Sequence, residues 1–178
     1  MQSFFSHGKL LLTAEYLVLR GAKALALPVV LRQSLQVQTE EAGGNPHINW
    51  FALAPGKPWF KAAFELPSMD IIGTDDRKKS AKLQLILLTL QQLQPQLFSG
   101  KYSFRMQTQL DFEPEWGLGS SSTLIANLAK WAGVDPYTLL QFSVGGSGYD
   151  IACALAKGPV IYQLDHLSPS LHDAYREQ

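Results

Sequence analysis

The stretch Gly117-Leu118-Gly119-Ser120-Ser121-Ser122-Thr123 decides how this sequence is interpreted, because its glycines and hydroxyl residues directly precede an apolar segment. That segment, residues 124–129, predicts a helix that begins at the serines. Unpaired backbone N–H groups and the helix dipole favour an anion at such a helix start. Glycines allow a phosphate to approach the backbone closely, and serine hydroxyls add donors or a metal ligand. The alternative interpretation is an ordinary serine-capped helix after a glycine turn.

The composition predicts a globular chain of one good-sized domain or two very small ones. Hydrophobic residues make up 46% and charged residues 17% of its 178 residues. Lys+Arg and Asp+Glu balance at 15 each, so no nucleic-acid partner is expected. The single cysteine, Cys153, excludes an internal disulfide and a cysteine-rich zinc site and favours a cytoplasmic setting. The longest apolar run, residues 24–31, is too short to span a bilayer, so no membrane partner is expected.

Strand and helix signals mix without a regular β-α alternation, which favours an α+β fold over a doubly wound parallel sheet. The first quarter of the chain predicts strands joined by tight turns, and residues 47–53 and 59–66 predict a hairpin. The clearest helix spans residues 75–94, and its apolar face is expected at Ala81, Leu85, Leu88 and Gln92 or Leu93, widened by Leu83, Leu87 and Leu90. The later elements are a strand over 101–110, helices over 120–132, from 136 and over 149–156, and a strand over 159–164.

Several common sites are excluded by the sequence. There is no GxxxxGK[ST], and Ser122 stands where the third glycine of GxGxxG belongs. The histidines His7, His47, His166 and His172 are scattered, and no HExxH occurs. We therefore expect neither a P-loop of the Walker type nor a metal cluster built from side chains.

Two further segments carry candidate chemical groups. His7-Gly8-Lys9 places a lysine near the N-terminus, and Gly145-Gly146-Ser147-Gly148-Tyr149-Asp150 delivers a carboxylate at a helix start. Taken alone, Lys9 also fits an exposed surface lysine. Asp150 likewise fits a first-turn acid that favours the helix dipole. The order of the three segments distinguishes these interpretations.

In that order, the segments resemble the GHMP kinases, the superfamily of galactokinase, homoserine kinase, mevalonate kinase and phosphomevalonate kinase. Residues 8–21 are similar to the opening of the mevalonate and phosphomevalonate kinases, with Ala14 where the family usually has glycine. Residues 117–122 match the family's phosphate loop, usually GLGSSA. Residues 148–152 are similar to the subgroup named for its GYDIA signature. The resemblance covers nearly the whole chain.

The resemblance implies an ATP-dependent phosphotransferase that acts on a small alcohol or phospho-alcohol, with ATP and Mg²⁺ as cofactors. Lys9 would lie near the accepting hydroxyl, and Asp150 would be the base that takes its proton. Lys9 beside Asp150 would also keep the carboxylate ionised. Ser121 would help to hold Mg²⁺. The residues implied to bind the ATP phosphates are Gly117, Leu118, Gly119, Ser120, Ser121 and Ser122.

The sequence departs from the family in two ways. Mevalonate kinases place a Mg²⁺-binding glutamate shortly before the aspartate, where this sequence has Leu139 and Leu140. The family's second half carries a third glycine-rich motif, which has no counterpart after Asp150. Residues 1–178 are therefore interpreted as the N-terminal, ATP-binding domain of a GHMP kinase, with the fold shared with ribosomal protein S5 domain 2 and with the C-terminal domain expected to be absent. The alternative is a non-catalytic nucleotide- or partner-binding fragment, which would expose an apolar interface and self-associate or bind a partner.

Overall fold

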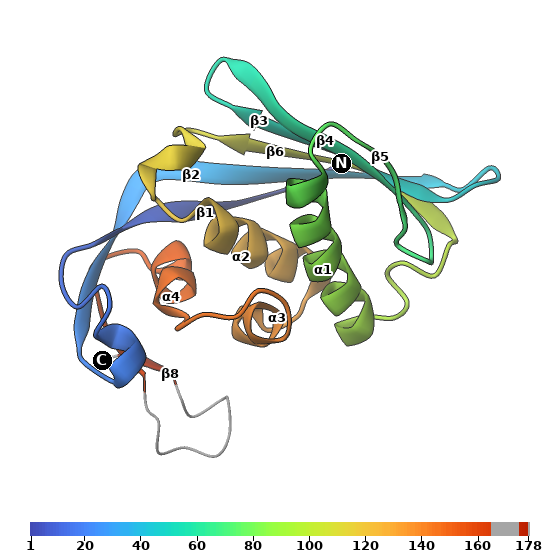
Figure 1. Ribbon diagram of the computed structural model, residues 1–178. Coiled ribbons are helices and arrows are strands. Elements are labelled where there is room, and N and C mark those ends of the chain that lie inside the picture. The colour runs from blue at the N-terminus through green and yellow to red at the C-terminus, as the bar shows by residue number, and fades with distance from the viewer. Residues whose placement is uncertain (165–174, 178) are drawn as a thin grey trace.

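The computed structural model describes residues 1–164 and 175–177, which form one sheet with helices against one face (Figure 1). His166 and His172 lie outside the described residues. The strands are β1 (Gln2–Leu11), β2 (Ala24–Glu41), β3 (His47–Ala54), β4 (Lys57–Glu65), β5 (Ile71–Thr74), β6 (Tyr102–Leu110), β7 (Val160–Leu164) and β8 (Tyr175–Glu177). The helices are α1 (Arg77–Leu93), α2 (Ser120–Ala132), α3 (Pro136–Phe142) and α4 (Tyr149–Leu155), with short 3₁₀ helices η1 (Val18–Arg20) and η2 (Pro114–Trp116).

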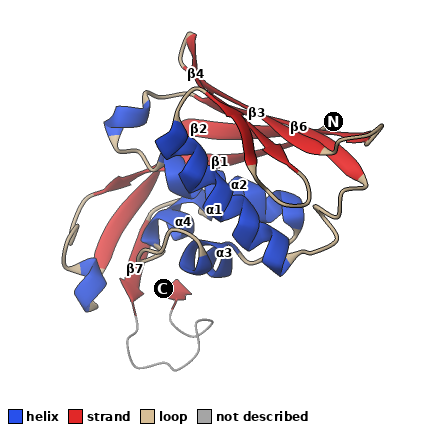
Figure 2. Ribbon diagram, turned by 45° about the vertical axis from the view of Figure 1, so that its right-hand side comes forward, coloured by secondary structure: helices blue, strands red, loops and turns tan. Residues whose placement is uncertain are grey.

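Strand β2 organises the sheet, because it is long enough to pair with three other strands. It pairs antiparallel with β1, with β6 and, near its start, with β7. Beyond β6 lies β3 in a parallel pair, followed by β4 and β5 in antiparallel pairs. One mixed sheet with helices on one face (Figure 2) confirms the predicted mixture of strands and helices without regular alternation. The likeness to ribosomal protein S5 domain 2 stays a prediction.

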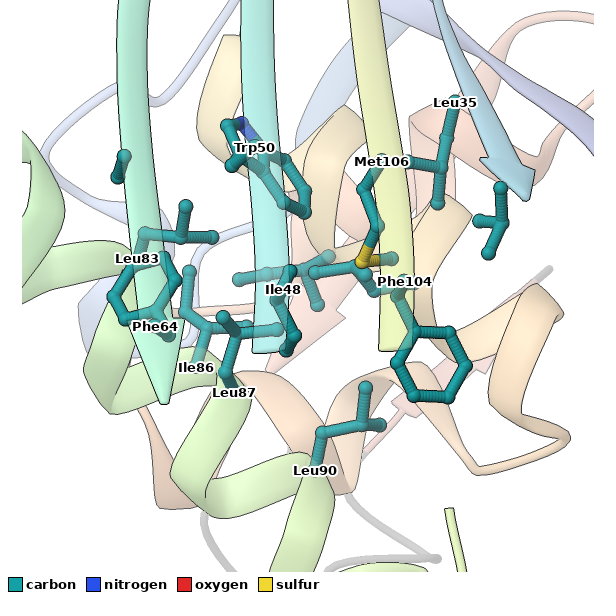
Figure 3. Close-up of a cluster of buried hydrophobic side chains, with 14 of the residues drawn as sticks. Leu35, Ile48, Trp50, Phe64, Leu83, Ile86, Leu87, Leu90, Phe104 and Met106 are labelled. Atoms are coloured by element: carbon teal, nitrogen blue, oxygen red, sulfur yellow. The ribbon is translucent and has the colours of Figure 1, made fainter. Parts of the chain in front are cut away.

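The hydrophobic core lies between α1, α2 and the inner face of the sheet (Figure 3). Alternate residues of β3 and β6, such as Trp50 and Met106, point towards the helices. Each fully buried large apolar side chain contributes roughly 1.5–3 kcal/mol relative to an exposed one. This layer therefore holds α1 and α2 firmly against the strands. Within the described residues, no helix is long and apolar enough to cross a membrane.

Helix α1 confirms the helix expected over residues 75–94 but buries only part of the expected apolar face. Asp76 caps it by accepting hydrogen bonds of 3.0 Å from two backbone N–H groups of the first turn. The expected face was wrong at Ala81 and Leu85, which are exposed. The residues expected to widen it, Leu83, Leu87 and Leu90, are buried. The buried residues are Ser80, Leu83, Ile86, Leu87, Thr89 and Leu90. The stripe at 83, 86, 87 and 90 carries four large apolar side chains at helical spacing, and it is the one that meets the sheet.

The hairpin of β3 and β4 confirms the one expected over residues 47–66. The first quarter of the chain differs from the expectation after Leu11, where β1 ends. Ala14 has a φ of 64°, which is left-handed and takes the backbone out of an extended path, and η1 follows. Strand β5 was not predicted, because its four residues carry no clear alternation.

Candidate active site

Residues 117–122 form the turn that leads into α2, and the turn depends on left-handed glycines. The φ angle is 70° at Gly117 and 84° at Gly119. An added Cβ on Gly119 would lie 2.8 Å from Ser122 Oγ and 3.2 Å from Lys9 Cγ, so both backbone angle and space require glycine there. No side chain caps α2. Within the described residues, its first backbone N–H groups therefore have no capping side chain as partner.

A bulge in β1 brings Lys9 to this turn. The pairing register with β2 shifts between His7 and Lys9. At the bulge, a Cβ on Gly8 would lie 3.0 Å from the Val29 side chain and 3.1 Å from the Leu118 carbonyl oxygen. The backbone N–H of Lys9 donates to the same Leu118 carbonyl at 2.9 Å. The N-terminal motif and the glycine-serine turn are thus joined through their backbones.

Lys9 also reaches the third motif. Its Nζ lies 3.2 Å from Asp150 Oδ1 and donates a 3.1 Å hydrogen bond to the Tyr149 hydroxyl. Gly148, with a φ of 88°, begins α4 and places both partners in its first turn. Asp150 Oδ1 is buried and accepts no hydrogen bond within the described residues, so the ion pair with Lys9 is its contact. The structure therefore brings the two predicted catalytic residues together beside the turn.

Burial and charge act in opposite directions on this pair. Burial raises the pKa of the Asp150 carboxyl, and the attraction of Lys9 offsets only part of that effect. Burial lowers the pKa of Lys9, but Asp150 and Tyr149 together outweigh it, so the net pKa of Lys9 is raised. Lys9 thus favours the ionised carboxylate as expected. The net shift of the Asp150 pKa is nevertheless upward, because desolvation is the larger effect.

The three serines of the turn have different surroundings. Ser121 Oγ accepts a 2.9 Å hydrogen bond from Lys82 Nζ on α1. Ser122 Oγ instead donates to the Gly119 carbonyl at 2.8 Å, and the residue is only 6% exposed. Its hydroxyl therefore stabilises the helix start, and Ser120 and Ser121 are the serines that face a neighbouring pocket.

This pocket has a volume of about 240 Å³ and lies between α1, the start of α2 and the inner face of the sheet. Trp50 and Trp59 contribute to its apolar wall, and Lys79 and Lys82 bring positive charge. Lys79 Nζ lies 5.4 Å from the centre of the Trp59 ring. The sequence analysis missed these residues. The spacing of Lys79 and Lys82 places them on one side of a helix. Nothing in the sequence showed that this side of the helix would lie next to Ser120 and Ser121.

The donor set for a metal is sparse. The described residues contain no group of three or more His, Cys, Asp or Glu side chains that could hold a metal ion. Leu139 and Leu140, at the position of the family's glutamate, are buried in the core. Mg²⁺ commonly uses one or two protein ligands together with substrate phosphates. The Ser121 hydroxyl beside the turn therefore fits a metal that arrives with a nucleotide.

No protein-family model and no curated protein sequence matches this chain. Solved structures do match it. Phosphomevalonate kinase of Streptococcus pneumoniae, in complex with phosphomevalonate and AMPPNP, has a TM-score of 0.63 at 18% identity, over 92% of this chain and 50% of that one. Mevalonate kinase of Methanococcus jannaschii has a TM-score of 0.62 at 13% identity, over 91% and 53%. D-glycero-D-manno-heptose 1-phosphate kinase of Bacteroides thetaiotaomicron has a TM-score of 0.61 at 16% identity, over 99% and 58%.

This chain has the fold of the GHMP kinase N-terminal domain. It spans about half the length of the GHMP kinases that it matches. Ala14, which replaces the family's usual glycine, nevertheless has a left-handed φ of 64°. Glycine adopts that conformation without steric cost, so the backbone at this position is of the kind that a glycine suits.

Proposed function

We propose that this chain binds ATP and forms the nucleotide-binding half of a phosphotransferase that acts on a small alcohol or phospho-alcohol. The observation that carries the proposal is the ion pair of Lys9 and Asp150 at 3.2 Å, beside a turn to which Lys9 is also bonded through its backbone. A kinase of the same fold holds phosphomevalonate and AMPPNP, and a Leishmania major mevalonate kinase of this fold holds R-mevalonate.

The order of groups around the turn matches the order of the parts of ATP. The apolar pocket with Trp50 and Trp59 suits the base. Ser120 and Ser121 lie between that pocket and the helix start, where backbone N–H groups and the helix dipole favour phosphates. Lys82 adds a positive charge on the pocket side. Lys9 would then lie beside the terminal phosphate, and Asp150 beside the substrate hydroxyl that accepts it.

Each member of the pair has a role that its surroundings support. Asp150 would accept the proton of the substrate hydroxyl, and its raised pKa brings the carboxyl closer to neutral pH, where a general base is effective. Lys9 would stay protonated and offset negative charge on the transferred phosphoryl group. Mg²⁺, when bound with ATP at Ser121, would neutralise phosphate charge. The backbone of residues 117–120 would align the phosphates.

The test combines calorimetry of AMPPNP with an ADP-release assay using mevalonate and phosphomevalonate. We expect Asp150→Ala to lower turnover by about a hundredfold or more, the effect typical of a general base, while AMPPNP affinity stays nearly unchanged. Asp70→Ala is the matched control, because Asp70 is an exposed carboxylate remote from the turn. Turnover that survives Asp150→Ala would remove the base role, and failure of the unmodified chain to bind AMPPNP would contradict the proposal.

A second candidate function is nucleotide binding without phosphoryl transfer. It is favoured by the observation that the chain spans about half of each matched kinase. The same experiment separates the two functions. AMPPNP binding with no ADP release from the unmodified chain would support binding alone, whereas ADP release that depends on Asp150 would support the phosphotransferase.

A further inference from the structure

We propose that Gln33 and Thr108 hydrogen-bond the edge of a purine base at the floor of the pocket and thereby determine which nucleotide the chain prefers. This inference rests on the proposed nucleotide-binding function. Both residues line the pocket, Gln33 from β2 and Thr108 from β6, and both are only 2% exposed. They are polar groups placed among apolar side chains, where a polar group without a partner is costly.

Within the described residues, the Gln33 amide makes one of the four hydrogen bonds of which a primary amide is capable. Thr123, a buried residue in the first turn of α2, donates its hydroxyl to Gln33 Oε1 at 2.7 Å. The amide nitrogen, Nε2, has no hydrogen bond to any described residue. This nitrogen keeps some solvent-accessible surface, and because Gln33 lines the pocket, a bound molecule can reach it there. With its oxygen occupied, Gln33 presents N–H donors to whatever the pocket holds.

Thr108 adds a second group to the same floor. Its hydroxyl has no hydrogen bond within the described residues and is likewise not enclosed. A hydroxyl both donates and accepts. An N–H donor beside a hydroxyl complements the edge of a purine, where ring nitrogens that accept alternate with exocyclic groups.

The rest of the pocket favours a flat base over a phosphate at this depth. Trp59, which is partly exposed, lines it, and aromatic side chains stack on every base because each base has a π face. Of the two lysines that line the pocket, Lys79 is paired with Asp76 at 2.7 Å. Lys82 instead directs its charge to the start of α2, where its Nζ bonds Ser121. Phosphates are therefore drawn towards the turn, and the base is left to face Gln33.

Gln33 is also held rigidly before any ligand binds. Its carbonyl accepts a 2.9 Å hydrogen bond from Asn127 Nδ2, and its side chain is fixed by Thr123. A group that is already ordered loses little conformational entropy on binding, so its hydrogen bond contributes more fully to affinity.

Calorimetry with deaza nucleotides tests the contact on the unmodified chain. ATP is compared with 1-deaza-ATP, 3-deaza-ATP and 7-deaza-ATP, each of which lacks one ring-nitrogen acceptor. We expect one of the three to bind about tenfold more weakly than ATP, the upper range for the loss of a neutral hydrogen bond. Equal affinity for ATP and all three analogues would overturn the inference without any substitution.

Gln33→Met then assigns the contact, because methionine keeps the length of the side chain and removes the donor. We expect it to lower ATP affinity about tenfold. The deaza analogue that binds weakly to the unmodified chain should bind Gln33→Met with the same affinity, and inorganic tripolyphosphate should also bind both proteins equally. Gln36→Met is the matched control, since Gln36 lies on the same strand but faces away from the core.

The outcomes separate this inference from the proposed function. If Gln33→Met weakens ATP and all three analogues by the same factor, Gln33 does not contact the missing ring nitrogen. The inference then fails, but the proposed nucleotide binding stands. A chain that binds neither ATP nor tripolyphosphate loses both. Urea unfolding of Gln33→Met checks that any loss of affinity occurs in a folded protein.

Discussion

Gly119→Ala tests the close packing around Gly119 in the glycine-serine turn. Gly119 has a φ of 84°, where a residue with a side chain costs about 1–2 kcal/mol. The new Cβ would lie 2.8 Å from Ser122 Oγ and displace a hydroxyl that now donates to the Gly119 carbonyl. Loss of that hydrogen bond adds about 1 kcal/mol. We therefore expect the free energy of unfolding to fall by about 2–3 kcal/mol.

Gly117→Ala is the matched control, because Gly117 shares the backbone conformation without the contact. Its φ is 70°, and among the described residues no heavy atom beyond its two chain neighbours lies within 4 Å of the position of an added Cβ. It should lose only the backbone contribution of about 1–2 kcal/mol. The difference between the two variants, about 1 kcal/mol, measures the contact between the turn and the residues packed against it.

Urea unfolding followed by circular dichroism measures both variants, provided that their m values agree. For a chain of this size, 1 kcal/mol corresponds to about 2–4 °C in Tm. Gly119→Ala should therefore melt roughly 4–12 °C below the unmodified chain. Equal stability of Gly119→Ala and Gly117→Ala would refute the reasoning, because it would show that the space around residue 119 has no energetic consequence.

Two further predictions concern charges near the turn. Lys82→Met should weaken AMPPNP binding about tenfold or more, because a charge-assisted hydrogen bond contributes about 1.5–3 kcal/mol; calorimetry measures it, with exposed Lys78→Met as control, and equal affinities would contradict it. Lys9→Met should raise the pKa of Asp150 further, since the attraction of Lys9 then no longer offsets burial, and carbon NMR of the carboxyl measures this. Because the pKa of Asp150 is higher in the folded state than in the unfolded state, its contribution to stability is fully present below the unfolded pKa and is lost as pH rises through the folded pKa. Lys9→Met should therefore extend that loss of stability to higher pH. An unchanged Asp150 pKa would show that Lys9 does not act on it.

Much of the fold could be predicted from local signals. The bounds of α1 follow from Asp76, which caps its start, and from Pro95, which follows its end. The alternation in β2 likewise predicted a strand. The order of the strands could not be predicted, because β3 lies beside β6 in a parallel pair formed by residues distant in sequence. The face of α1 depended on the same non-local arrangement.

The candidate site shows the same division. Lys9, the glycine-serine turn and Asp150 were predicted from the order of their motifs, and the structure places them together. Tyr149 stands inside a motif that the sequence analysis quoted but received no role, although its hydroxyl accepts from Lys9. Gln33 is one of several glutamines in an alternating strand. Only the pairing of β2 with its neighbours and the packing of α2 show that it lines a pocket.

Buried polar side chains beneath the turn hold the site in position, because their hydrogen bonds are directional whereas apolar contacts are not. Ser6 Oγ donates to Asn127 Oδ1 at 2.8 Å, Asn127 Nδ2 donates to the Gln33 carbonyl, and Thr123 donates to the Gln33 side chain. All four residues are at most 2% exposed. Apolar contacts are non-directional and would tolerate a small slide of α2, whereas such a slide would break several of these bonds at once, at about 1–3 kcal/mol for each buried group left unpaired. The network therefore fixes α2 on β1 and β2, and through β1 it fixes the helix start relative to Lys9.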